Sequence, residues 1–154
     1  MKSVVLDTNL LVLLVVGSLD RSLIARHKRT RKFTPEDFDT LTQILDQYQQ
    51  IVVTPNVVTE TSNLLQQVNE ATAHSLLRAL KQILLKIDEK FVASTDAAEV
   101  KGYFFLGIAD AATLQGALAD SDLFTDDLPL YLQASRLGRK AINFTYYQAQ
   151  NMSL

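Results

Sequence analysis

Short apolar runs alternate with helix-like segments along the chain, and this alternation restricts the fold more than any other feature of the sequence. Such runs, rich in β-branched side chains, have the length and composition of buried strands. They are Val4–Leu6, Ile51–Val53, Phe91–Ala93, Leu123–Thr125 and Ala141–Phe144. Because strands separated by helices are joined by crossover connections, they tend to pair in parallel. The sequence therefore predicts an α/β sandwich built on a mostly parallel sheet.

Helix signals fill the intervals between these runs. Asn9 can cap an apolar helix from Leu10 to Val16, which Gly17 would end, and Thr34 before Pro35 is a strong helix start. Further helices are expected from Pro55, from Asn69 to about Ile87, from Thr95 or Asp96 to about Phe105, over Ile108–Ala119, and from Pro129 to Leu137. No internal repeat or linker divides these elements.

Length and composition favour a single domain. The 154 residues are 47% hydrophobic, which is enough for one core, so one domain covering residues 1–154 is expected. Cysteine is absent, which excludes disulfides and thiolate metal sites and fits a reducing compartment. The net charge of −2 points to no particular partner.

Positive charge is concentrated in one stretch, Ser18–Lys32, which we expect to form an irregular or short helical insert. Between Arg21 and Lys32 it holds six of the fifteen lysines and arginines. A basic cluster of this kind either contacts a phosphate backbone or forms a solvated loop. The candidates for RNA binding are Arg26, Lys28, Arg29, Arg31 and Lys32.

The N-terminal segment does not have the pattern of a secretion signal or a membrane anchor. Asp7 and Asn9 interrupt its apolar run, and no small-residue cleavage site follows cleanly. The uninterrupted run Leu10–Val16 is far shorter than the roughly 20 residues that a membrane span needs. We therefore expect no membrane contact and a cytoplasmic location.

Acidic residues follow two of the predicted strands. Asp7 comes directly after the first strand, and Asp126 and Asp127 come after the fourth. Ligands of parallel α/β sheets bind beyond the carboxyl ends of the strands, so these acids lie where chemistry is expected. Each also has a structural alternative, because Asp7 can cap a helix and the Asp126–Asp127 pair can form a turn.

Two further acids lie inside helices with apolar surroundings. Glu60 falls about 40° from Leu64 on the helical wheel, at the edge of the apolar stripe. Asp110 lies in a helix that is apolar on nearly all sides, and a lone buried carboxylate needs a partner such as a divalent cation. The structural alternatives are an ordinary half-exposed acid for Glu60 and a helix-dipole interaction for Asp110.

Taken together, these acids favour a metal-assisted hydrolase. Clusters of carboxylate oxygens suit hard cations such as Mg²⁺ and Mn²⁺, which activate water and stabilise a phosphoryl transition state. No cysteine nucleophile exists, and the two histidines, His27 and His74, lie in polar stretches without an obvious acidic partner.

Four short segments, in the right order, resemble those that carry the acids of PIN domains. Val4–Val12 is similar to the opening strand and metal-binding turn of that family, and the other segments are similar to those that bear its second, third and fourth acids. These are Val57–Thr61, Gly107–Ala112 and Leu123–Asp127. The resemblance covers most of the chain.

PIN domains are three-layer α/β/α folds, and many of them cleave single-stranded or structured RNA with Mg²⁺ or Mn²⁺. By this resemblance Asp7, Glu60 and Asp110 would be catalytic metal ligands. The Thr-x-Asp pattern of the family points to Asp127 as the fourth acid, and Asp126 is equally placed. Asn9 and Thr125 would orient ligands or a bound water.

The resemblance also implies partners. Small PIN proteins of the VapC toxin kind pair with an antitoxin and form dimers, so an antitoxin protein and a homodimer are expected beside RNA. The basic insert and the helix from Phe38 depart from the minimal toxin pattern.

Other functions remain open at this point. Haloacid-dehalogenase-type phosphatases also begin with Asp after a strand, but they place a second Asp where this chain has Asn9. A response-receiver domain needs paired acids at the first strand, where Asp7 stands alone. A PIN scaffold that binds RNA or protein without cutting is the principal alternative to an endoribonuclease.

Overall fold

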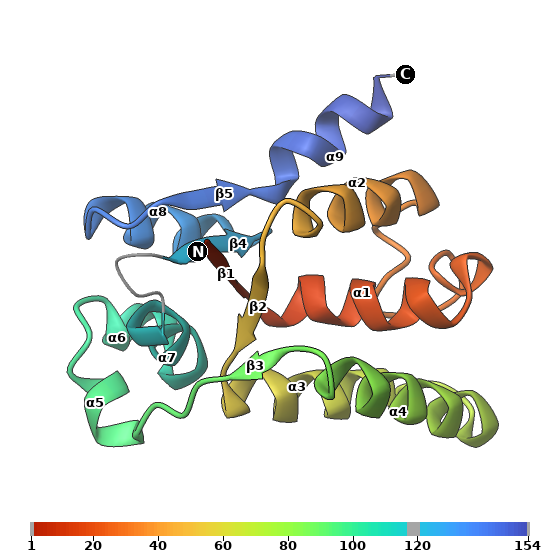
Figure 1. Cartoon of the computed structure of the whole chain (residues 1–154), viewed down its shortest axis with the longest axis horizontal. Coiled ribbons are helices and arrows are strands. Elements are labelled where there is room, and N and C mark those ends of the chain that lie inside the picture. Colours follow the sequence, from red (N-terminus) through yellow and green to blue (C-terminus); the bar gives the residue numbers. More distant parts are fainter. Residues whose placement is uncertain (1, 117–120, 154) are drawn as a thin grey trace.

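A five-stranded parallel sheet forms the centre of the protein in the computed structural model, which describes residues 2–116 and 121–153 (Figure 1). Its strands are β1 (Ser3–Leu6), β2 (Gln50–Val53), β3 (Asp88–Glu89), β4 (Ser121–Thr125) and β5 (Ala141–Asn143). Their order is β3-β2-β1-β4-β5, and each neighbouring pair is parallel. The predicted α/β fold is confirmed.

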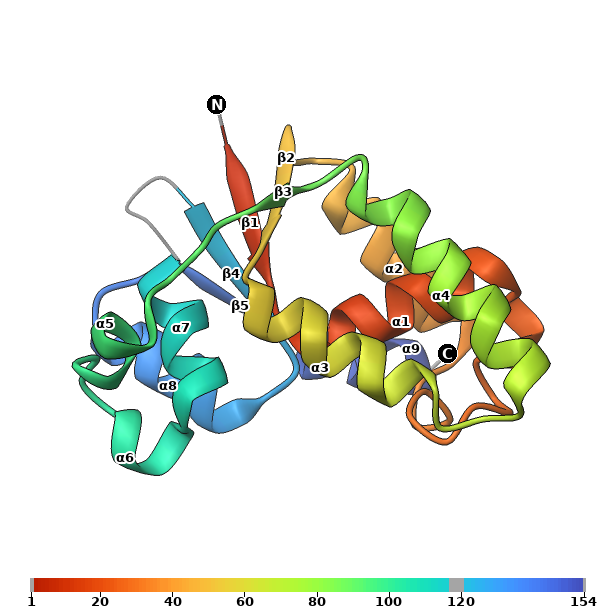
Figure 2. The same cartoon turned by 90° about the horizontal axis from the view of Figure 1, so that it is seen from below.

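Helices cover both faces of the sheet, so the fold is a three-layer α/β/α sandwich (Figure 2). One side carries α1 (Thr8–Leu19), α2 (Pro35–Leu45), α3 (Pro55–Leu65), α4 (Glu70–Leu84) and α9 (Phe144–Met152). The other side carries α5 (Ser94–Ala98), α6 (Tyr103–Leu106), α7 (Ile108–Gly116) and α8 (Leu128–Arg136). A hydrophobic cluster lies on each face of the sheet, and successive side chains of β1 point to opposite faces. Val4 and Leu6 pack in one cluster and Val5 packs in the other.

Most helix starts lie where the sequence predicts them, because each has a capping side chain. Thr54 caps α3 and Asn69 caps α4, as the sequence predicts. The cap of α1 is Asp7 and not Asn9, so this helix begins at Thr8. At α2, Thr34 accepts a hydrogen bond from the Asp37 amide while the Asp37 carboxylate accepts one from the Thr34 amide. These caps fix the helices that surround the sheet.

Gly17 does not end the first helix, as the sequence suggested; α1 continues to Leu19. A Cβ atom at Gly17 would overlap the ring of Phe38, so the glycine allows α2 to approach α1 closely. Glycine lowers the intrinsic stability of a helix, but at this position it is required for the packing of α1 against α2.

The third strand is Asp88–Glu89 and does not include Phe91–Ala93, so that prediction is wrong. Its neighbour β2 ends at Val53, where Pro55 starts α3, and residues beyond Lys90 have no strand beside them. Val92 packs in a small hydrophobic cluster with Ala97, whereas Phe91 is 77% exposed.

Two predicted elements of the second half also differ from the structure. The helix expected up to Phe105 is split into α5 and α6, because Gly102 adopts a left-handed φ of 105° between them. The last strand ends at Asn143, whose side chain caps α9. Phe144 is the first residue of α9 and is fully buried against Phe33 and Phe124.

The basic insert is irregular apart from a 3₁₀ turn at Arg21–Leu23, as expected. A buried histidine anchors it, because the His27 ring accepts the Arg29 amide at 3.0 Å and its Nε2 lies 3.2 Å from the Leu65 carbonyl oxygen. The expectation that His27 has polar surroundings is therefore wrong. His74 has a neighbour in Glu70 on α4, with 3.9 Å between Nε2 and Oε1.

Within the described part of the chain, we find no helix that combines the length and the apolar character needed to cross a bilayer.

Candidate active site

The order of the strands places Asp7 and Thr125 next to each other at the centre of the sheet. From β1 the chain runs outward through β2 to β3 and then returns to β4 on the opposite side of β1. Leu6 pairs with Phe124, so the residues that follow, Asp7 and Thr125, come side by side. The reversal of strand order between β1 and β4 is the position at which sheets of this type bind ligands.

Asp7 is held at this position by two hydrogen bonds. Its Oδ1 accepts the Leu10 amide at 3.3 Å, and its Oδ2 accepts the Thr125 hydroxyl. The residue is only 5% exposed. Burial, followed by the negative charge of Asp126, raises the pKa of Asp7 to about 8, although the hydrogen bonds from Thr125 and Leu10 act in the opposite direction. The hydrogen bonds thus fix the orientation of the carboxyl group, and its raised pKa means that ionisation is unfavourable.

Thr125 connects this carboxylate with the start of α8. Its Oγ1 accepts the Asp127 amide at 2.9 Å, and its hydroxyl proton is therefore directed to Asp7. The supporting role that the resemblance to PIN domains implies for Thr125 stays a prediction.

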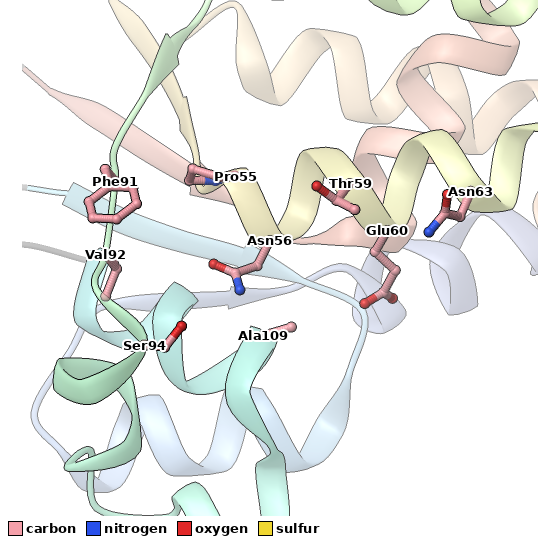
Figure 3. Close-up of a pocket in the computed structure, with 9 residues that line it drawn as sticks. All are labelled: Pro55, Asn56, Thr59, Glu60, Asn63, Phe91, Val92, Ser94 and Ala109. Carbon is pink, nitrogen blue, oxygen red and sulfur yellow. The ribbon is translucent and has the colours of Figure 1, made fainter.

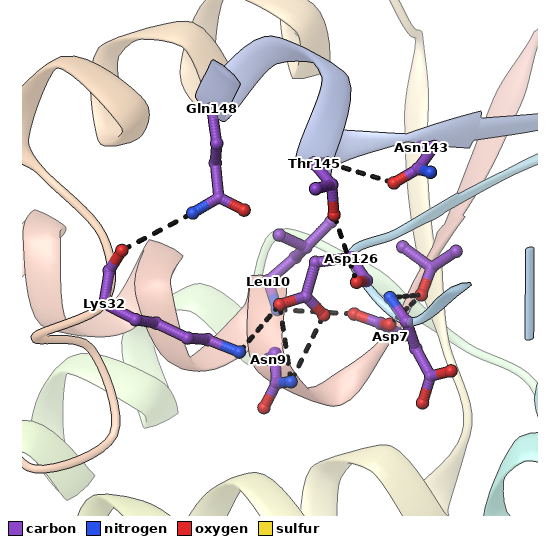
Figure 4. Close-up of polar contacts among 10 residues, drawn as sticks. Asp7, Asn9, Leu10, Lys32, Asp126, Asn143, Thr145 and Gln148 are labelled. Carbon is purple, nitrogen blue, oxygen red and sulfur yellow. Dashed lines mark hydrogen bonds and ion pairs between the residues drawn. The ribbon is translucent and has the colours of Figure 1, made fainter. Parts of the chain in front are cut away.

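Asp126 faces Asp7 and has two cationic or polar partners of its own (Figure 4). Its Oδ1 accepts the Asn9 side-chain amide at 3.2 Å, and its Oδ2 lies 2.9 Å from the Lys32 ammonium. Its backbone carbonyl accepts the Thr145 hydroxyl at 3.3 Å, so the first turn of α9 supports the loop. Lys32 is thereby part of the acidic site, a role that the sequence analysis did not give it.

Asp110, Asp127 and Glu60 form the second half of the cluster. The half-buried Asp110 lies in the first turn of α7. Burial, the charge of Asp127 and the charge of Glu60, in that order, raise its pKa to about 6. Asp127 also caps α8 through the Leu130 amide at 3.1 Å. The charge of Asp126 thus acts on Asp7 and the charge of Asp127 acts on Asp110, so both acids lie close to the candidate cluster.

The cluster has the donor chemistry of a hard-cation site without a closed set of ligands. Within residues 2–116 and 121–153, no three acidic or histidine side chains are arranged to hold a metal ion. However, the side chains of the cluster all end in carboxylates, the ligands that hard cations prefer. The pKa values of Asp7 and Asp110 are raised first by burial and then by neighbouring carboxylates, and a divalent cation would favour the ionised form of both groups.

A pocket of about 480 Å³ opens beside the cluster (Figure 3). We call it the Glu60 pocket. Its lining includes Asn56, Glu60 and Asn63 from α3, Phe91 from the segment after β3, Ser94 from α5 and Ala109 from α7. Because Glu60 lines the pocket and is also coupled to Asp110, the pocket joins the acidic cluster at this residue. The exposed ring of Phe91 was missed because an apolar residue in a short run resembles a strand residue.

The candidates for RNA binding in the basic insert differ in their availability. Three have partners, since Arg26 lies 3.6 Å from Asp20, Arg29 donates to Gln67 at 2.6 Å, and Lys32 is held by Asp126. Lys28 and Arg31 are exposed, and no side-chain partner for either is found among the described residues. These two are the most available cations of the insert.

No protein-family model and no curated protein sequence matches this chain. Among solved structures, it is similar to a domain of a functionally unknown protein from Methanocaldococcus jannaschii DSM 2661, with a TM-score of 0.48 and 18% identity. That similarity covers 93% of this chain and 91% of the other. Since the name of the other domain gives no activity, the function rests on the site itself.

Proposed function

We propose that the protein is a metal-dependent endoribonuclease of the PIN type. The observation that carries the proposal is the convergence of Asp7 and Asp126 at the reversal of strand order, with Asp110, Asp127 and Glu60 coupled to them. A buried group of like charges lowers the stability of the fold, and such groups are typical of sites that bind cations or substrates.

Mg²⁺ or Mn²⁺ would be held by Asp7, Glu60, Asp110 and the Asp126–Asp127 pair. Bound there, it would activate a water molecule and stabilise the charge of the phosphoryl transition state. The protein itself keeps the site in place: Thr125 fixes the orientation of Asp7, and Asn9 does the same for Asp126. Lys32 supplies Asp126 with a counter-charge while no cation is bound.

RNA is the proposed substrate, and Lys28 and Arg31 of the basic insert are the proposed contacts to its backbone. A homodimer and an antitoxin partner belong to the same proposal and rest on the resemblance to toxin-type PIN proteins alone. A cytoplasmic location is proposed with them.

A non-catalytic RNA- or protein-binding module is the second candidate. It is favoured by the contact between Lys32 and Asp126, because an internal ammonium ion already neutralises part of the cluster. It is also favoured by the lack of a closed three-ligand arrangement among the described acids and histidines.

Cleavage of a mixed pool of labelled single-stranded and structured RNAs, with Mn²⁺, Mg²⁺ or EDTA, separates the two candidates. Wild type is compared with Asp7→Asn and Asp110→Asn, and with Asp46→Asn as a control that alters an exposed acid outside the cluster. Metal-dependent cutting that is lost only in the two cluster variants supports the nuclease. If wild type neither cuts RNA nor gains thermal stability from Mn²⁺, the catalytic proposal fails and the binding module takes its place.

A further inference from the structure

We propose that the Glu60 pocket binds one unpaired nucleobase of a single-stranded RNA, stacked on the ring of Phe91. This inference rests on the proposed function, because it takes the acidic cluster next to the pocket to be the place where the RNA backbone is bound. It adds the part of the substrate that the pocket recognises and the residue on which affinity depends.

The position of Phe91 is the first argument. A phenylalanine that is 77% exposed lies at a pocket of about 480 Å³, where it gains little from the core of the protein. Aromatic side chains beside a hollow are common stacking platforms for bases, since every base offers an aromatic face. A volume of this size falls in the range of small-molecule sites, roughly 300–1,000 Å³.

The polar lining is the second argument. Asn56 and Asn63 present amides that can both donate and accept hydrogen bonds, and Ser94 adds a hydroxyl. No hydrogen-bonding partner of these three side chains is found in the described part of the chain, so they are available to the edge of a base. In Figure 3 the side chains of Asn56 and Glu60 extend from α3 toward α7, and the ring of Phe91 lies on the segment after β3, beside Pro55.

The charge of the pocket is the third argument, because it excludes the phosphate as the occupant. Glu60 is the charged group of the described lining, which contains no lysine or arginine. A phosphate would be repelled there, whereas a neutral ring would not. Since Glu60 is coupled to Asp110, a base in the pocket places the adjacent backbone at the acidic cluster.

Fluorescence anisotropy with labelled oligouridylate and oligoadenylate tests this proposal. Binding is measured at low salt with Ca²⁺ in place of Mg²⁺ or Mn²⁺, so that a hard cation lies between the acidic cluster and the RNA backbone. A gel of the recovered strands checks that none was cut, so the result does not depend on catalysis. The variants are Phe91→Ala and Phe91→Trp, and the matched control is Phe104→Ala, which removes a ring that is 98% exposed on α6, away from the pocket.

We expect Phe91→Ala to weaken binding of the single strands by about five- to hundredfold, with Phe91→Trp close to wild type. Phe104→Ala should bind like wild type, and a duplex of the same sequence should not distinguish any of the variants. The slope of affinity against salt should stay the same in Phe91→Ala, because stacking releases no counterions.

Equal affinities of Phe91→Ala and Phe104→Ala would overturn the proposal, and so would a wild type that binds no single-stranded RNA. This outcome is distinct from failure of the proposed function. Phe91-dependent binding without any metal-dependent cutting would leave the base pocket in place and remove the nuclease. If RNA is cut and neither cutting nor binding changes in the Phe91 variants, the nuclease proposal stands and the base pocket is rejected.

Discussion

A carboxylate is buried at each end of β4, and the two carboxylates have opposite electrostatic surroundings. Asp122, near the start of the strand, is 4% exposed and accepts the Tyr48 hydroxyl at 2.6 Å, with the ammonium groups of Lys2 and Lys140 at 3.2 and 3.6 Å. Asp126, just beyond the other end, is 5% exposed and has Lys32 as its ionic partner. Both acids are buried, but their neighbours differ.

At the Asp122 end, positive groups outnumber the single carboxylate, and we interpret this end as a structural clamp. At the Asp126 end, one lysine faces a group of carboxylates, and burial together with these neighbouring charges raises the pKa values of Asp7 and Asp110. Uncompensated charge lowers stability, and its retention at one end of the sheet supports the proposal that this end binds a cation. Variants at the two ends should therefore change stability in opposite directions.

The largest effect is expected from Asp7→Asn, which should stabilise the metal-free protein at pH 8 by several kcal/mol, since each unit of pKa shift corresponds to about 1.4 kcal/mol. Asp7 has an unfolded pKa near 3.8 and a folded pKa of about 8. Between these values the folded state keeps a proton that the unfolded state has lost, so the free energy of unfolding of wild type falls as the pH rises.

Urea denaturation in EDTA at a series of pH values measures this difference. The gap between Asp7→Asn and wild type should be small below pH 4 and should grow toward pH 8. A gap that is independent of pH would show that the carboxyl group of Asp7 ionises as easily in the folded as in the unfolded protein.

Asp122→Ala should have the opposite sign and a smaller size. It removes the acceptor of the Tyr48 hydroxyl, whose pKa is raised by burial and by the hydrogen bond to Asp122. A polar group left without a partner costs about 1–3 kcal/mol, which would appear as a lower urea midpoint at neutral pH. Unchanged stability would mean that this end of β4 is not a clamp.

Lys32→Met should lower the stability of the metal-free protein and raise the affinity of the site for cations. Without the ammonium, Asp126 keeps only the neutral Asn9 amide, so the protein in EDTA should be less stable. Mn²⁺ no longer competes with an internal cation and should bind about two- to fivefold more tightly, as expected for a half-exposed pair. Calorimetric titration measures the affinity, and weaker Mn²⁺ binding would instead make Lys32 a support of the site.

The smallest effect is expected in the basic insert. Arg31→Ala should lower the salt slope of single-stranded RNA binding by about 0.7, the value for one lost phosphate contact. Arg26→Ala serves as the control, because Arg26 lies beside Asp20. If both variants keep the slope of wild type, the insert is a solvated loop and not a contact surface.

The fold was predictable where one local signal decided each element. Apolar runs gave β1, β2 and β4, and a capping side chain before proline gave α2 and α3. Elements that depend on their neighbours were missed. The strand β3 is short because β2 ends beside it, and α9 contributes Phe144 and Tyr147 to the large hydrophobic cluster.

The site was predictable to the same degree and for the same reason. Asp7, Asp126 and Asp127 follow strands, so their convergence is a consequence of parallel topology. The contact between Lys32 and Asp126 joins positions far apart in the sequence, and it depends on how an irregular insert folds back. No periodicity or motif encodes such a contact, and the same holds for the exposure of Phe91.

Calorimetric titration of Mn²⁺ into the metal-free protein at pH 8 tests most directly that the end of β4 beside Asp7 is the functional one. We predict saturable binding to wild type, loss of that binding in the Asp7→Asn/Asp110→Asn double variant, and unchanged binding in Asp122→Ala. Binding that survives in the double variant, or no saturable binding to wild type, would contradict the assignment of the acidic cluster as a cation site.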